Sequence, residues 1–169
     1  RSIEGVAQPF TINSRRGVVI PAGEYSFNDW FVTGRTNPAA PLSVNGRYGF
    51  GDFYDGYRRS YQMGIGARVN EQVNITANYR RNAVSLPGGS FTTNLLSSRV
   101  TYDFTTSVFL NALLQYNTDA RQWSSNVRLN IIHRPLSDFF LVYNERRDTR
   151  SDDLIDRAVI MKVTYMMAF

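Results

Sequence analysis

The chain has 169 residues and a formal net charge of +5, and it contains no cysteine. This length corresponds to one domain, and the lack of cysteine excludes disulfide frameworks and thiolate metal sites. No segment approaches the roughly 18 unbroken apolar residues of a membrane-spanning helix, so insertion into a membrane would require a β-barrel. Lys162 is the only lysine, and this excess of arginine suggests a surface that does not face ordinary bulk water. Because the sequence begins at Arg1 rather than at a methionine, we expect a processed product or the end of something longer.

In chain order, apolar and polar side chains alternate with a period of two between turn signals, and no helical period occurs. The stretch 10–20 is expected to add one strand before the turn Pro21-Ala22-Gly23. A strand from about Tyr25 to Thr36 is expected to contain a bulge, because its first aromatic residues are out of phase with Trp30 and Val32. The remaining strands are expected over residues 42–50, 61–69, 73–79, 96–104, 108–116, 123–131, 139–144 and 156–169. The total is nine or ten strands.

The closing strand, 156–169, shows the alternation most clearly. Its odd positions from Val159 to Phe169 are all apolar or aromatic, whereas the alternate positions include Asp156, Lys162 and Thr164. An apolar face that ends in an aromatic residue is typical of the last strand of an outer-membrane β-barrel. We therefore expect a signal for the barrel-assembly machinery, formed by Tyr165, Met167 and Phe169.

These patterns predict an all-β fold over residues 1–169, an antiparallel transmembrane β-barrel of the outer-membrane type. A soluble β-sandwich is the alternative. Aromatic residues at the strand ends and an arginine-rich opposite face argue against a sandwich core. With the C-terminus on the periplasmic side, periplasmic turns are expected at 37–41, 70–72, 104–107 and 135–137, and external loops at 51–57, 85–90, 118–122 and 145–153. Because bacterial barrels have even strand numbers, either ten strands close by themselves or a preceding segment or another chain completes a larger barrel.

Several runs carry a family resemblance. They are Gly17-Val18-Val19-Ile20-Pro21-Ala22-Gly23-Glu24-Tyr25, Phe50-Gly51-Asp52-Phe53-Tyr54-Asp55-Gly56, Leu86-Pro87-Gly88-Gly89-Ser90-Phe91-Thr92, Leu114-Gln115-Tyr116-Asn117, His133-Arg134-Pro135-Leu136-Ser137-Asp138 and Val142-Tyr143-Asn144-Glu145-Arg146-Arg147-Asp148. The chain resembles the C-terminal part of a bacterial outer-membrane family whose members carry an N-terminal carbohydrate-binding-module-like domain and a β-barrel behind it. The resemblance covers nearly all of this chain and implies a barrel in the outer membrane of a Gram-negative bacterium. It favours the second arrangement, in which this chain is part of a larger barrel.

Candidate chemical groups are few. His133 is the sole histidine and has no second histidine or cysteine with which to bind a metal. Asp52 and Asp55 could hold a cation, although an Asx turn explains them more simply. No serine or carboxylate has a histidine placed to activate it. We therefore expect neither enzyme activity nor a cofactor, and no nucleic-acid partner.

The polar face is expected to line a lumen through Arg47, Arg68, Arg80, Arg99, Arg128 and Lys162. Burying so much uncompensated charge requires water or acidic partners. The favoured function is therefore a pore or transport role for polar or anionic solutes. The alternative is a plugged structural barrel that acts as a scaffold or surface anchor for a partner or a sugar-binding domain, and an outer-membrane hydrolase is a third, weaker possibility.

Four further arginines are expected on the lipid-facing phase at the external strand ends, namely Arg59, Arg81, Arg121 and Arg157. At this height a lipid-facing arginine costs only about 0–1 kcal/mol. Guanidinium groups also match phosphate geometry. We expect these four to bind lipopolysaccharide, and snorkelling of the side chains to water is the alternative.

Overall fold

The computed structural model describes residues 2–13, 15–134 and 136–166, and these residues form thirteen β-strands. The strands are β1 Ser2–Val6, β2 Phe10–Asn13, β3 Val18–Ile20, β4 Gly23–Phe27, β5 Asp29–Arg35, β6 Leu42–Phe53, β7 Gly56–Arg68, β8 Val73–Leu86, β9 Gly89–Thr105, β10 Val108–Asn117, β11 Gln122–Arg134, β12 Ser137–Asp148 and β13 Leu154–Thr164. Within these ranges there is no helix long and apolar enough to cross a membrane. The all-β prediction is confirmed.

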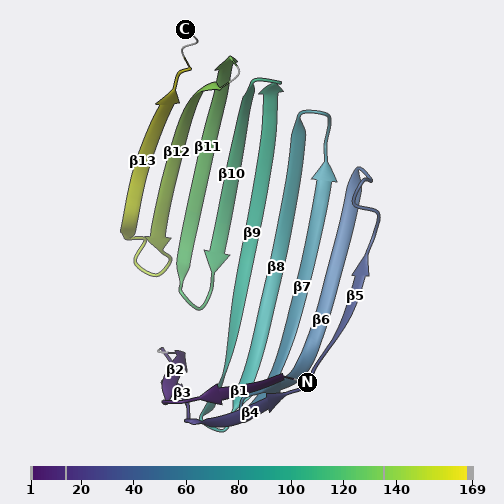
Figure 1. The fold of residues 1–169 in the computed structure, drawn as a ribbon, viewed down its shortest axis with the longest axis vertical. Helices are drawn as coiled ribbons and strands as arrows, with labels where there is room; N and C mark the ends of the chain where they lie inside the picture. The colour runs from purple at the N-terminus through teal and green to yellow at the C-terminus, as the bar shows by residue number, and fades with distance from the viewer. Residues whose placement is uncertain (1, 14, 135, 167–169) are drawn as a thin grey trace.

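Nine strands, β5 to β13, form one antiparallel sheet in which each strand pairs with its neighbours in sequence (Figure 1). This simple order follows from short connections, because two antiparallel strands can be joined by a tight turn. β5 and β13 are the two edges, and no pairing joins them in the described part of the chain. The sheet is therefore open, and these residues do not form the ten-strand barrel that closes on itself.

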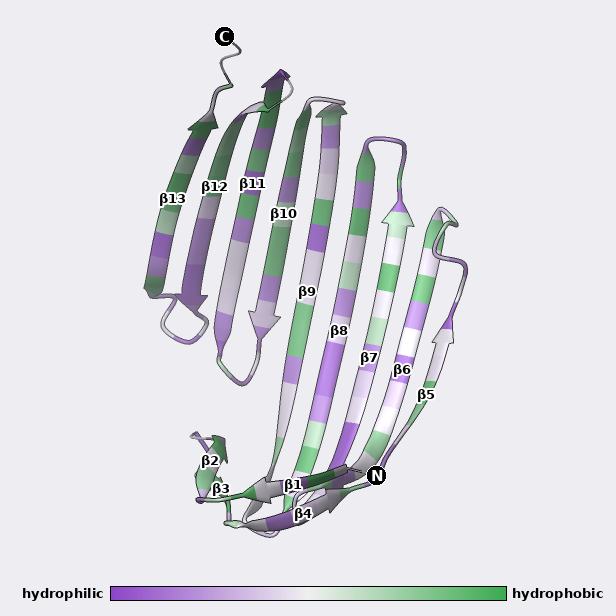
Figure 2. Cartoon of the chain, in the orientation of Figure 1, coloured by the Kyte–Doolittle hydropathy of each residue, from purple (hydrophilic) through white to green (hydrophobic). Residues whose placement is uncertain are grey.

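Hydrophobic and hydrophilic residues alternate along many of the strands, as the bands in Figure 2 show. Because successive side chains of a strand point to opposite faces, the two faces of the sheet differ in polarity. Residues in direct cross-strand register share a face. One row on the apolar face consists of Met63, Tyr79, Leu96, Tyr116 and Trp123. Large side chains on this face are open to the surroundings, and Trp30 and Met161 are each 67% exposed. Such an extended apolar surface is rare on a monomeric soluble protein.

Residues 2–13 and 15–27, here called the N-terminal cap, lie outside this sheet. β1 pairs with β4, and β2 pairs with β3. In Figure 1 the cap lies across the end of the sheet at which β8 turns into β9. Val18 and Ile20 are almost fully buried against Val84, Leu86 and Phe91. Val84 and Leu86 alternate along β8 on the same face as Arg80, so the cap packs on the polar face of the sheet.

An aromatic cluster joins the cap to the turn between β6 and β7. The Tyr54 ring makes edge contacts with Phe10, Tyr25 and Phe27 of the cap, at centroid distances of 5.8, 5.1 and 5.4 Å. Burial and the nearby Glu4 carboxylate raise the pKa of the Tyr54 hydroxyl above its usual value. Edge-to-face pairs of this kind add to the stability gained from burial alone.

The cap corrects two predictions about the N-terminal region. Residues 25–36 are not one bulged strand, because β4 and β5 separate at Asn28 and pair with different partners. The stretch predicted as one strand of the wall instead contains two short strands, Phe10–Asn13 and Val18–Ile20, which pair with each other.

The closing strand also differs from its predicted range, since β13 begins at Leu154 and ends at Thr164. Tyr165 follows the strand and is 64% exposed. Met167 and Phe169 of the expected assembly signal lie outside the described residues. The other predicted strands are present, but several are longer than predicted. β6 continues to Phe53, β8 to Leu86 and β12 to Asp148, so the connections expected at 51–57, 85–90 and 145–153 are shorter than predicted.

Candidate functional site: the polar face of the sheet

A groove with a volume of about 790 Å³ lies on the polar face over β5 to β10. Its polar lining includes Arg35, Asn45, Arg47, Gln62, Asn78 and Arg80. These side chains come from four adjacent strands, and strand alternation directs them to the same face. Two predicted lumen residues, Arg47 and Arg80, are therefore brought together in one depression.

Arg47 and Arg80 flank Gln62 in cross-strand register. Because neighbouring strands are about 4.8 Å apart, the two arginine backbones are roughly 10 Å apart. The Arg47 guanidinium carbon lies 4.1 Å from the centre of the Phe31 ring. This cation–π contact orients Arg47 and leaves its N–H groups available.

Asn45 and Asn78 form a second polar pair, one row away from the arginines. They flank Gly64 in register. A Cβ atom at Gly64 would lie 2.2 Å from Asn45 Oδ1 and 2.8 Å from Asn78 Oδ1, so both amides lean over this glycine. The missing side chain at Gly64 is what allows the two amides to converge.

The other predicted lumen residues share this face but lie outside the groove. Arg68 and Arg128 lie at the two ends of one row of residues in cross-strand register. Between them the row contains Asn74, Thr101 and Asn111. The Arg128 guanidinium carbon lies 5.2 Å from the Phe140 ring centre. Arg99 is opposite Leu113, and Lys162 is opposite Phe140.

None of these six predicted lumen residues forms an ion pair within residues 2–13, 15–134 and 136–166. Two acids on the polar face are paired with other arginines, because Asp29 contacts Arg58 at 3.4 Å and Asp156 contacts Arg146. The groove therefore keeps a positive charge that no carboxylate of the described chain neutralises.

Arg35 is a groove residue that the sequence analysis missed. The sequence predicts a single bulged strand over residues 25–36, and a bulge leaves open which face of the sheet Arg35 lies on. The structure instead has a strand break at Asn28. The signal is present within β5, where Phe31, Thr33 and Arg35 alternate with Trp30 and Val32.

The predicted outer arginines do not form one set. Arg59 and Arg81 lie in β7 and β8 on the apolar face, on neighbouring strands. The prediction that Arg121 belongs to a strand and faces lipid is wrong. Arg121 lies in the connection between β10 and β11, with a φ of 52°. Its carbonyl oxygen accepts a hydrogen bond from the Thr149 N–H at 2.8 Å.

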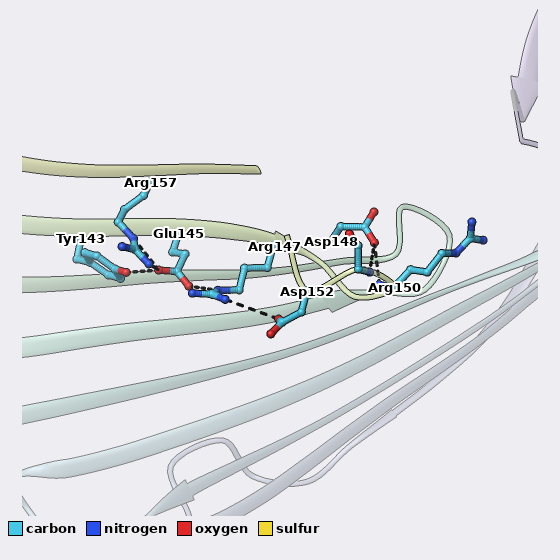
Figure 3. Close-up of polar contacts among 8 residues, drawn as sticks. Tyr143, Glu145, Arg147, Asp148, Arg150, Asp152 and Arg157 are labelled. Atoms are coloured by element: carbon cyan, nitrogen blue, oxygen red, sulfur yellow. Dashed lines mark hydrogen bonds and ion pairs between the residues drawn. The ribbon is translucent and has the colours of Figure 1, made fainter. Parts of the chain in front are cut away.

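Arg157 belongs to an ion-pair cluster on the apolar face, near the end of β12 (Figure 3). Its Nη2 atom lies 2.7 Å from Glu145 Oε2, and Arg147 Nε lies 2.5 Å from Glu145 Oε1. The Tyr143 hydroxyl also donates to Glu145. Asp152 approaches Arg147 at 3.7 Å. The Arg157 guanidinium is thus already engaged by a carboxylate.

Residues suited to metal or acid–base chemistry are scattered. His133 is exposed in β11. No three histidine, aspartate or glutamate side chains among the described residues gather as metal ligands would. Asp52 accepts hydrogen bonds from the Asn28 backbone N–H at 3.1 Å and the Asn28 side chain at 2.8 Å, and so connects β6 to the residue before β5.

The groove and the apolar opposite face are therefore the two features on which function can be argued. The sequence matches no family model, and neither a curated protein nor a solved structure is significantly similar to the chain.

Proposed function

We propose that this chain forms part of the wall of a β-barrel in the outer membrane of a Gram-negative bacterium, with the polar face lining a water-filled lumen that passes polar or anionic solutes. The observation that carries the proposal is the contrast between the two faces. The apolar face leaves large side chains such as Trp30 exposed, while the polar face holds arginines without ion-pair partners in the described chain. Hydrocarbon suits the first face, and water suits the second.

The open edges bear on how such a wall would be completed. Unpaired backbone groups at β5 and β13 would be costly in hydrocarbon. We infer that a preceding segment or another chain pairs with these edges and closes a larger barrel, which the barrel-assembly machinery would insert. This arrangement agrees with the family resemblance.

Reconstitution of the completed barrel, purified from outer membranes with the segment or chain that closes it, into planar bilayers tests the pore. We expect discrete conductance with a preference for anions. Replacing Arg47, Arg80 and Arg128 with glutamate should shift the reversal potential towards cation preference. A pore that conducts with unchanged selectivity would show that these arginines do not line the ion path.

A plugged barrel is the second candidate, and the N-terminal cap favours it. The cap packs on the polar face and reaches the connection between β10 and β11, where Arg15 donates to the Ala120 carbonyl at 2.7 Å and Asn13 to Asp119 at 3.2 Å. With the C-terminus on the periplasmic side, the cap covers the external mouth. The double variant Arg15→Ala/Asn13→Ala should raise conductance if the cap closes the pore. Conductance should stay unchanged if the cap does not block the lumen.

Arg59 and Arg81 remain candidates for lipopolysaccharide binding at the outer leaflet. They carry charge on the apolar face and have no ion-pair partner within the described residues. Replacing both with glutamine should lower thermal stability more in membranes that contain lipopolysaccharide than in neutral detergent. Equal loss in both media would leave snorkelling as the explanation.

A further inference from the structure

The groove on the polar face has the composition of a binding site for a small anion. Three guanidinium groups line it, those of Arg35, Arg47 and Arg80, and no carboxylate is among its described lining residues. Its volume of about 790 Å³ is within the range of small-molecule sites.

Two of the arginines lie in one cross-strand row, separated by a single strand. Arg47 and Arg80 extend from β6 and β8 on either side of Gln62. The Phe31 ring, 4.1 Å from the Arg47 guanidinium carbon, restricts the position of that side chain. An arginine that is already oriented loses less conformational freedom when it binds.

The neighbouring row supplies groups that bind hydroxyls. Asn45 and Asn78 converge over Gly64, and each offers an amide N–H₂ donor and a carbonyl acceptor. Both side chains are exposed to the groove. Thr33 and Gln115 add further polar atoms at its two sides.

We infer that the groove is a saturable site for a small phosphate monoester whose remaining part carries hydroxyl groups. Arg47 and Arg80 bind the phosphate, because guanidinium forks match phosphate oxygens and two arginines balance its charge of about −1.5 to −2. Asn45 and Asn78 bind the hydroxyls. This inference deepens the proposed function and rests on it, since it names the solute class of the same lumen.

Calorimetric titration of the same completed barrel in neutral detergent tests the site, with glucose 6-phosphate as the probe and inorganic phosphate and glucose as comparisons. We expect one saturable site that binds glucose 6-phosphate more tightly than either comparison. Arg47→Gln/Arg80→Gln should weaken binding by about tenfold or more for each arginine.

Two control variants separate the site from general charge. Arg68→Gln/Arg128→Gln removes the same charge from the same face outside the groove, and it should change the affinity by less than about threefold, since the charges are distant and screened. Asn45→Ser/Asn78→Ser should weaken binding of glucose 6-phosphate but leave that of inorganic phosphate unchanged. Equal thermal unfolding midpoints will show that the variants are folded.

Equal loss of affinity in the two arginine double variants would overturn the inference, because it would show a diffuse potential rather than a site. Binding without saturation, or inorganic phosphate binding as tightly as glucose 6-phosphate, would overturn it as well. Conductance distinguishes this failure from failure of the proposed function. An anion-selective pore without a saturable site would refute the inference and leave the pore proposal standing.

Discussion

Glu145 neutralises two arginines, Arg147 and Arg157, on the apolar face of the sheet. Its side chain is only 14% exposed because Tyr143, Arg147 and Arg157 surround it. A charge in a partly apolar setting is tolerated when it is paired and hydrogen-bonded. This pairing explains how the apolar face can carry two guanidinium groups at the end of β12 and the start of β13.

We predict that Glu145→Gln lowers the unfolding temperature more than Asp156→Asn does. Glu145→Gln leaves two arginines without a counter-charge on the apolar face, whereas Asp156→Asn frees one arginine on the polar face, where water can solvate it. Thermal unfolding of both variants in detergent checks the order. Equal losses would show that the two faces do not differ in polarity around these charges.

Gly56 is required where the turn after β6 meets the end of β8. A Cβ atom at Gly56 would lie 2.0 Å from the Ser85 carbonyl oxygen, whereas one at Gly46 would have its nearest contact at 3.9 Å. We predict that Gly56→Ala destabilises the protein by about 1–3 kcal/mol, because the backbone must shift. Gly46→Ala should stay within about 0.5 kcal/mol. Denaturant unfolding of the two variants measures the difference, and similar values would contradict the close approach.

At the scale of elements, the long strands and the N-terminal cap differ in how well the sequence predicts them. From residue 42 onwards each strand is 10 residues or longer, so the alternation repeats often enough to set both strand and face. The cap strands have three to five residues, and β1 pairs with the distant β4. A period of two cannot be recognised over so few residues.

A signal for the cap was nevertheless present in β8 and β9. The polar face, which carries Arg80 and Asn82, becomes apolar at Val84, Leu86 and Phe91. Apolar residues at these positions indicate that another part of the protein covers this end of the face. The structure shows that Val18 and Ile20 of the cap do so.

We predict that Ile20→Ala loosens the cap while the nine-stranded sheet stays intact. Ile20 is fully buried, and truncating a buried isoleucine costs about 2–5 kcal/mol. Val19→Ala is the matched control, since Val19 lies in the same strand and is 45% exposed. Limited proteolysis should cleave the cap faster in Ile20→Ala than in Val19→Ala or the wild type. Identical cleavage rates in both variants would mean that this core does not hold the cap.

At the scale of the whole molecule, the decisive feature is one open sheet with two unlike faces. The alternation predicts both faces, and with them the shared side of Arg47, Arg80 and Arg128. The sequence could not predict which of these arginines meet in a groove, because that depends on register and on the curvature of the sheet. The sequence also could not predict the turn conformation of Arg121. Its φ of 52° is not that of a strand residue, so the alternation does not apply to it. The family resemblance and the location in the outer membrane stay predictions.

Single-cysteine labelling tests most directly whether the apolar face meets lipid and the polar face meets water. The chain has no cysteine, so each introduced thiol reports on one position. Asn78→Cys and Gln115→Cys place the thiol on the polar face, and Ala77→Cys and Leu114→Cys place it on the apolar face of the same strands. In outer-membrane fractions, a charged maleimide should label the first two and spare the last two, and all four should react after denaturation. Equal labelling of both faces in intact membranes would contradict the proposed barrel wall.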